Sequence, residues 1–175
     1  MRFQGLGYRG HDPKWAFSPL SGEGAAIHGG RFNPIGMPAL YLALTVEGLF
    51  IEVAHGFGHR FDPLTVSTYE VDVDDVADLR TNEARSGAGV VLDDLACAWA
   101  LDRASRRKPA SWMVAERLVE AGAAGILVSS FALGARSGMD NLVLWRWGND
   151  PPHRVAVHDP SGRLPRDQSS WPSST

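Results

Sequence analysis

Apolar residues recur with helical spacing over residues 46–55 and predict an amphipathic helix there. Thr45 precedes this segment as a suitable N-cap, and Gly56 follows it as a terminator. On the helix, Glu52 lies beside Leu49 at the border of the apolar stripe. We therefore expect its carboxylate to be half sheltered from solvent.

Two more helices are predicted, over 92–104 and 111–120, with Pro109 between them. Cys97 has the position of buried filler on the first of these helices. As the single cysteine of the chain, it cannot form an internal disulfide or begin a zinc site.

Short apolar runs bounded by turn residues predict the strands. These runs cover residues 39–43, 125–129 and 141–147, and an alternating edge strand is expected over 154–158. The segment 64–73 is also typical of a strand, but its apolar residues change parity. This change predicts a β-bulge near Ser67.

Strands dispersed among three helices indicate an α+β fold, because the last two strands lie too close together for a helical crossover. The first 40 residues are rich in glycine and proline and are expected to form a long loop that serves a site. One domain is predicted over 1–158, with a flexible polar tail over 159–175. Solvated loop charges are expected at Asp72, Asp74, Asp75 and Asp78.

The length, charge and composition of the chain argue against several classes of protein. The chain has 175 residues, a formal net charge of −3, and no apolar run of the roughly 18 residues that a membrane span requires. Its only basic cluster, residues 103–108, follows a predicted helix, so nucleic-acid binding is not expected. The start of the chain lacks the pattern of a secretory signal, and a cytoplasmic location is expected.

The densest group of polar and glycine residues lies at 28–36. Paired glycines allow close backbone approach to a ligand, and Arg31 could bind a pyrophosphate with its forked guanidinium. The alternative is a turn with an exposed arginine. Glu52 likewise has an alternative as a surface residue, but this loop, a strand with Tyr41 and the helix with Glu52 follow each other directly and could line one cleft.

Other site classes have weaker support. His55 and His59 have the spacing of paired metal ligands, but glycines intervene and no HExxH pattern is present, so no metal is expected. Ser129 and Ser130 follow a predicted strand but lack the G-x-S-x-G sequence of a nucleophile elbow.

Several of these motifs together resemble the RES domain, named for its arginine, glutamate and serine. The resemblance extends over roughly residues 8 to 147. The matching residues are Tyr8-Arg9, Gly24-Ala25, Gly29-Gly30-Arg31-Phe32-Asn33-Pro34-x-Gly36, Leu40-Tyr41-x-Ala43, Ile51-Glu52, Leu127-Val128-Ser129-Ser130 and Asn141-Leu142-Val143. RES proteins are similar to ADP-ribosyltransferases in fold, which implies a mixed sheet core flanked by helices.

The resemblance also implies a site. The family's essential arginine, tyrosine, acidic residue and serine match Arg31, Tyr41, Glu52 and Ser130. Substrate contacts are further implied at Arg9, Gly30, Asn33 and Asn141. The chain departs from the family pattern at Phe32, where tryptophan is usual, and at Ser129, where a proline commonly precedes the serine. The choice between Ser129 and Ser130 therefore stays open.

The function implied by the resemblance is that of a toxin paired with an Xre-type helix-turn-helix antitoxin. Such toxins deplete NAD by cleaving its nicotinamide–ribose bond, with inorganic phosphate or water as the acceptor, and NAD is then substrate rather than cofactor. Arg31 would bind the pyrophosphate, Tyr41 would lie near the nicotinamide, and Ser130 would orient Glu52 or the ribose. An ADP-ribosyltransferase acting on a protein and a catalytically silent nucleotide-binding module are the alternatives.

Overall fold

The computed structural model describes residues 1–57 and 63–169 as one mixed sheet with helices packed around it. The strands are β1 (Phe3–His11), β2 (Leu40–Ala43), β3 (Thr65–Val73), β4 (Val76–Asp78), β5 (Gly125–Ser129), β6 (Asp140–Leu144) and β7 (His153–Val157). The helices are α1 (Glu23–His28), α2 (Val46–Phe57), α3 (Asn82–Gly87), α4 (Leu92–Ala96), α5 (Trp99–Ala104) and α6 (Ala110–Glu120), with a 3₁₀ turn at Pro13–Trp15.

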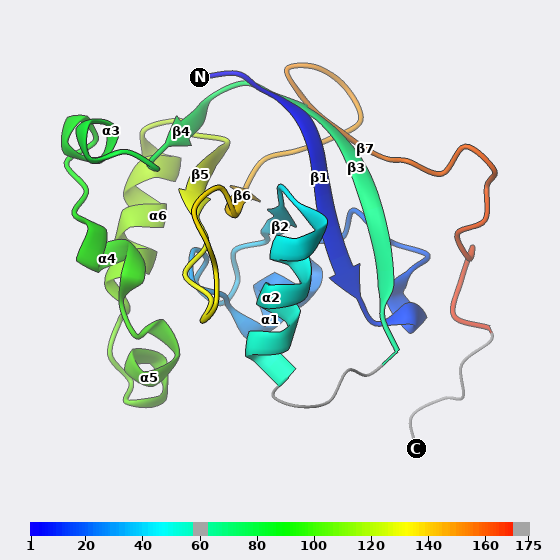
Figure 1. Cartoon of the computed structure of the whole chain (residues 1–175), viewed down its shortest axis with the longest axis horizontal. Helices are drawn as coiled ribbons and strands as arrows, with labels where there is room; N and C mark the ends of the chain where they lie inside the picture. Colours follow the sequence, from blue (N-terminus) through cyan, green and yellow to red (C-terminus); the bar gives the residue numbers. More distant parts are fainter. Residues whose placement is uncertain (58–62, 170–175) are drawn as a thin grey trace.

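The seven strands have the order β4-β5-β6-β2-β1-β3-β7, and only the β4–β5 pair is parallel. This confirms the predicted α+β class and the edge position of β7. β1 pairs with β3 along its whole length, but it pairs with β2 only where Tyr8 is opposite Ala43. Figure 1 shows β1, β3 and β7 on one side of α2, and β4, β5 and helices α3 to α6 on the other.

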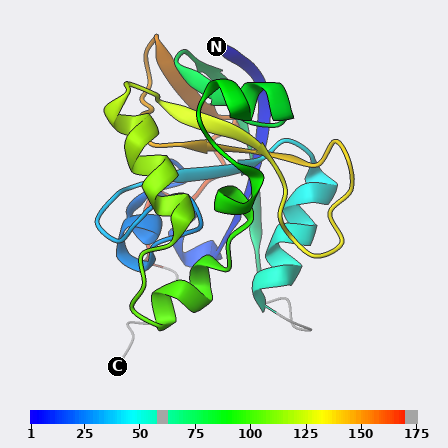
Figure 2. The ribbon, with the colours of Figure 1, turned by 90° about the vertical axis from the view of Figure 1, so that its left-hand side faces the viewer.

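Both faces of the sheet centre are buried, which explains the unbroken apolar runs in the sequence. Leu40, Leu142 and Leu144 belong to the core on one face, whereas Ile126 and Val143 belong to the core on the other. Figure 2 shows α6 (yellow-green) on the left and α2 (cyan) on the right of the view. Neighbouring residues of one strand thus contribute to two different cores, as the two-residue period of a strand requires.

The helices are short, and α2 is the longest with 12 residues. In the described parts of the chain, no helix is long and apolar enough to cross a membrane.

The predicted cap of α2 is confirmed, because Thr45 Oγ1 accepts a hydrogen bond from Gly48 N at 3.0 Å. Of the predicted stripe, Leu49 is buried but Val46 and Phe50 are exposed, since only one edge of α2 faces the sheet.

The prediction of a bulge near Ser67 was wrong. The register between β1 and β3 is continuous from His11 opposite Thr65 to Phe3 opposite Val73. Ser67 is buried and Val66 is 42% exposed. Inward and outward positions therefore alternate regularly. The apparent change of parity arose because the polar Ser67 faces inward and the apolar Val66 faces outward.

The prediction of a loop over the first 40 residues was also wrong, because this segment contains β1 and α1. Glycines interrupted the strand pattern at positions where other side chains pack. At Gly7, an added Cβ would lie 3.0 Å from Leu42 Cβ. Likewise, Asp72 and Asp78 lie within β3 and β4 rather than in loops.

The helix predicted over 92–104 is two helices, α4 and α5, with a break at Cys97 and Ala98. Cys97 has ψ 155°, an extended value that ends α4. Its side chain is half-buried at the helix end instead of filling a helix interior. Residues 159–169 contain no helix or strand, and the predicted flexibility of the tail stays a prediction.

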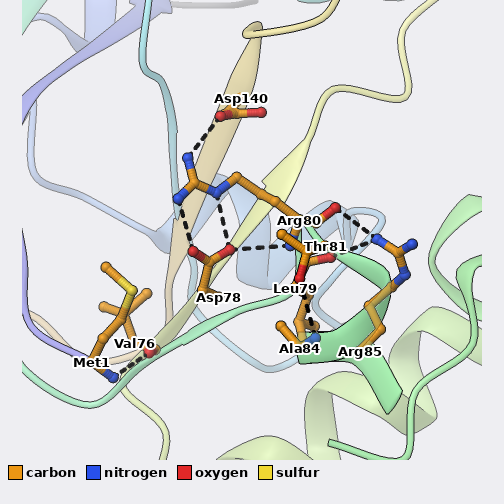
Figure 3. A network of polar contacts seen from close by, with 9 residues as sticks. All are labelled: Met1, Val76, Asp78, Leu79, Arg80, Thr81, Ala84, Arg85 and Asp140. Atoms are coloured by element: carbon orange, nitrogen blue, oxygen red, sulfur yellow. Dashed lines mark hydrogen bonds and ion pairs between the residues drawn. The ribbon is translucent and has the colours of Figure 1, made fainter. Parts of the chain in front are cut away.

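An ion-pair network ties the sheet edge to β6 (Figure 3). Arg80, just after β4, pairs with Asp78 at 2.8 Å and with Asp140 at 3.0 Å. The hydrogen bonds that its guanidinium donates to Asp78 and Asp140 raise the pKa of Arg80 above its ordinary value. Asp140 begins β6 and directly precedes Asn141, so the network holds the strand end that carries Asn141.

We predict that Leu142→Ala, in the middle of β6, lowers the free energy of unfolding by about 2–5 kcal/mol, because its fully buried side chain would leave a cavity. Leu133→Ala is the matched control, since Leu133 is 85% exposed and its truncation should change stability by less than about 0.5 kcal/mol. Urea denaturation would measure both. Equal effects of the two substitutions would contradict the core described above.

Candidate active site

The glycine loop at residues 29–33 is held in place by side chains from distant elements. Three consecutive carbonyls accept hydrogen bonds. The donors are Trp112 Nε1 to Gly30 O at 2.7 Å, Ser111 Oγ to Arg31 O at 2.5 Å, and Trp145 Nε1 to Phe32 O at 2.8 Å. These three bonds restrain the loop, because displacing it would leave the bonded carbonyls unpaired.

Tyr41 and Asn33 complete the support of this loop from the inside. The Tyr41 hydroxyl accepts a hydrogen bond from Phe32 N at 3.0 Å and donates to Asn33 Oδ1 at 2.7 Å. Asn33 is fully buried, and its Nδ2 donates to Ala25 O and Met37 O. Burial raises the pKa of Tyr41, so its hydroxyl stays protonated at neutral pH. Both polar groups therefore shape the loop, while the Tyr41 ring lines the cavities described below.

Arg31 projects from the loop toward the break between α4 and α5. Its Nη1 donates to Leu95 O at 3.1 Å and to Cys97 O at 2.7 Å. These carbonyls are available because the helix ends there. The guanidinium lies 5.1 Å from the centre of the Phe131 ring, a cation–π distance. Burial lowers the pKa of Arg31, yet a guanidinium remains charged at neutral pH.

Glu52 is fixed by two donors on one oxygen. Its Oε1 accepts hydrogen bonds from Ser130 Oγ at 2.5 Å and from Asn141 Nδ2 at 2.6 Å. Among the described residues no hydrogen bond reaches Oε2, so this oxygen is the one available to a ligand. Ser129 is exposed and pairs with Asp140 in the sheet. The geometry thus favours Ser130 over Ser129 as the serine that acts with Glu52.

Two cavities meet at Glu52. The larger has a volume of about 610 Å³ and is lined by Arg31 and by the aromatic rings of Phe32, Trp99 and Phe131. The smaller, of about 260 Å³, is lined by Arg9 and by residues of β1, β2 and α2. Both cavities share the residues Tyr41, Glu52 and Asn141. The smaller one lies where β1 and β2 pair only at Tyr8 and Ala43.

The structure therefore brings together the arginines, tyrosine, glutamate, serine and asparagine that the sequence singled out. Sequence reasoning missed the residues that hold them, above all Ser111, Trp112 and Trp145. No local pattern marks these three, because they contact the loop across more than 75 positions of sequence.

A metal site was not expected, and within residues 1–57 and 63–169 the structure shows no group of three or more potential metal-ligating side chains. The candidate metal ligands His55 and His59 are not included, because their side chains lie outside the described part of the chain.

We predict that Gly30→Ala destabilises the protein by about 1–3 kcal/mol, because its Cβ would lie 2.5 Å from the Tyr41 hydroxyl and 2.7 Å from Asn33 Oδ1. Gly24→Ala is the matched control. It lies in α1 with open space around its Cβ position, and alanine favours the helix. Thermal unfolding should show a lower midpoint for Gly30→Ala only, and equal midpoints would refute the close packing at Gly30.

Comparison with known proteins agrees with this geometry. The family model described as RES domain matches residues 6–167. Proteins named NAD(+) phosphorylase MbcT from Mycobacterium bovis and Mycobacterium tuberculosis are each 33% identical over 136 residues, which cover 70% of this chain and 72% of the relative.

The solved structure of the M. tuberculosis MbcT-MbcA toxin-antitoxin complex contains a chain that is 24% identical, with a TM-score of 0.64. The match covers 91% of this chain and 84% of that chain, and it shows a shared fold. Since the family model spans nearly all of the described residues and the expected residues converge on Glu52, this chain belongs to the RES domain family.

Proposed function

We propose that this protein cleaves the nicotinamide–ribose bond of NAD and transfers the ADP-ribose to inorganic phosphate. The observation that carries the proposal is the position of Glu52. Its carboxylate is held by Ser130 and Asn141 and lines the same cavity as Arg31. The relatives named NAD(+) phosphorylase support the choice of substrate and acceptor. Water and a protein side chain are the other acceptors that the same cleft could serve.

One carboxylate is enough for this bond. The nicotinamide nitrogen of NAD is cationic, so the base leaves as a neutral molecule without a general acid. Ordinary glycoside hydrolysis differs, because there two carboxyl groups divide the acid and nucleophile or base roles. Glu52 Oε2 would stabilise the positive charge that develops on the ribose, and the two donors on Oε1 keep the carboxylate from turning away.

Arg31 and the rings around it fit the rest of the dinucleotide. A volume of about 610 Å³ lies within the roughly 300–1,000 Å³ of sites that bury a small molecule. Nη1 of Arg31 is bound to backbone carbonyls, which leaves its other nitrogens to face a pyrophosphate. Phe32, Trp99 and Phe131 offer aromatic surfaces for the planar bases.

The proposed cellular role is that of the toxin in a toxin–antitoxin pair, with an Xre-type helix-turn-helix protein as the partner. The resemblance to the RES family and the MbcT-MbcA complex support this role. A cytoplasmic location would place the enzyme with its substrate. A neighbouring gene encoding a helix-turn-helix protein would support the pairing.

The decisive experiment incubates purified protein, freed of any inhibitor, with NAD in the presence and absence of phosphate and separates the products. Nicotinamide and phosphorylated ADP-ribose should appear only with phosphate. Glu52→Gln, which keeps the shape of the side chain, should lower kcat by about 10²- to 10³-fold with little change in thermal stability. Near-normal NAD loss by this variant would exclude Glu52 as the working carboxylate.

Ser130→Ala and Ser129→Ala form a matched pair, because Ser129 ends β5, Ser130 directly follows it, and of the two only Ser130 donates to Glu52. We expect Ser130→Ala to lower kcat about 10- to 100-fold through misplacement of the carboxylate, while Ser129→Ala stays close to wild type. Steady-state NAD consumption measures both. The reverse order of effects would reject the arrangement seen at Glu52.

A further inference from the structure

The two cavities at Glu52 differ in size. The smaller cavity, of about 260 Å³, lies below the roughly 300–1,000 Å³ of sites that bury a small organic molecule, so it cannot enclose a dinucleotide. A water molecule occupies about 30 Å³, and the cavity therefore has room for a small ion with part of its hydration shell. Apart from Arg9, Glu52 and Asn141, the residues that line this cavity are largely apolar and include Leu42, Ala43, Leu49 and Val53.

Each cavity has one arginine. Arg31 lines the larger cavity and Arg9 the smaller, and among residues 1–57 and 63–169 Glu52 is the only acidic residue that lines either of them. Arg9 is half-buried, and its Nη1 donates to Pro19 O at 3.0 Å and to Ser21 O at 2.9 Å. Among the described residues Arg9 forms no ion pair, so its charge is held in place by neutral carbonyls and is available to an anion.

Phosphorolysis of NAD needs two anions in one site, namely the pyrophosphate of NAD and the attacking phosphate. Hydrolysis needs only the first. A phosphate beside the Glu52 carboxylate would be repelled unless a cation offset the two negative charges. The two cavities that meet at Glu52 satisfy this requirement, because each contains an arginine that forms no ion pair among the described residues.

We propose that the smaller cavity is the acceptor subsite, where Arg9 binds inorganic phosphate for attack on the ribose of an NAD held in the larger cavity. This inference rests on the proposed function. It moves Arg9 from the NAD contacts that the family resemblance implied to the acceptor. It also explains why Glu52, Tyr41 and Asn141 line both cavities, since the reacting carbon must be reached from both.

The reaction balances without a further reactant. The bond between ribose C1 and the nicotinamide nitrogen breaks, and its electron pair neutralises the pyridinium ring. An oxygen of hydrogen phosphate forms the new bond to the same carbon, giving a phosphate ester of ADP-ribose and free nicotinamide. The proton that the hydrogen phosphate carries remains on the ester or passes to solvent.

The test measures KM for phosphate and KM for NAD separately, with purified full-length protein and inorganic phosphate as the probe. Arg9→Gln removes the charge, and we expect KM for phosphate to rise at least about tenfold while KM for NAD stays close to wild type. The product ratio should shift from phosphorylated ADP-ribose toward ADP-ribose. Arg31→Gln is the matched control, which should raise KM for NAD instead.

A second pair of variants leaves the contacts of Arg9 with Pro19 and Ser21 intact, in case Arg9→Gln does not fold. Val53 is half-buried and lines only the smaller of the two cavities. Val53→Glu adds a negative charge there, and Val53→Gln has the same shape without it. We expect Val53→Glu to have the higher KM for phosphate, with equal KM values for NAD in the two variants.

The outcomes separate this inference from the proposed function. A rise in KM for NAD alone in Arg9→Gln would assign Arg9 to NAD and overturn the acceptor subsite. NAD loss that gives ADP-ribose regardless of phosphate would also overturn it, while NAD cleavage would stand. No NAD loss by the wild-type protein under any condition would reject the proposed function itself.

Discussion

The backbone of residues 30–32 is partly buried, and the pairing of its polar groups organises the whole site. Donors for its carbonyls come from α6, through Ser111 and Trp112, and from Trp145, which directly follows β6. Tyr41 of β2 accepts a hydrogen bond from the amide of Phe32. Since an unpaired buried group costs about 1–3 kcal/mol, these bonds fix α6, β2 and the end of β6 relative to one loop.

Few charged side chains line the two cavities beside this loop. In the part of the chain that the structure describes, one carboxylate lines the two cavities and one arginine lines each of them. Both guanidiniums are held by backbone carbonyls rather than by acidic side chains, so their charges are not cancelled before a ligand arrives. The same principle applies to Glu52, whose two partners are neutral donors. In the proposed reaction, a site prepared in this way would bind an anion and stabilise a cationic ribose.

Irregular features of the fold have direct consequences for the site. The break between α4 and α5 exposes carbonyls that a continuous helix would have bonded, and Arg31 uses them. The limited pairing of β1 with β2 leaves the space of the smaller cavity. The ion pairs of Arg80 hold the beginning of β6 next to Asn141. The helix break and the limited strand pairing depart from a regular helix and a regular sheet, and together with the ion pairs they shape the site.

The sequence by itself determined the central strands, helices α2 and α6, and which residues were candidates for the site. Hydrophobic periodicity and a run of motifs in a given order are local properties, and Arg31, Tyr41 and Glu52 lie close together in the chain. Only the tertiary structure showed that Ser130 donates to Glu52, that the glycine-rich residues 3–11 form β1, and that Asn33 supports the loop while Asn141 holds Glu52. These outcomes depend on contacts between distant segments, such as Asn141 and Glu52 at a separation of 89 residues, and no local pattern encodes such a contact.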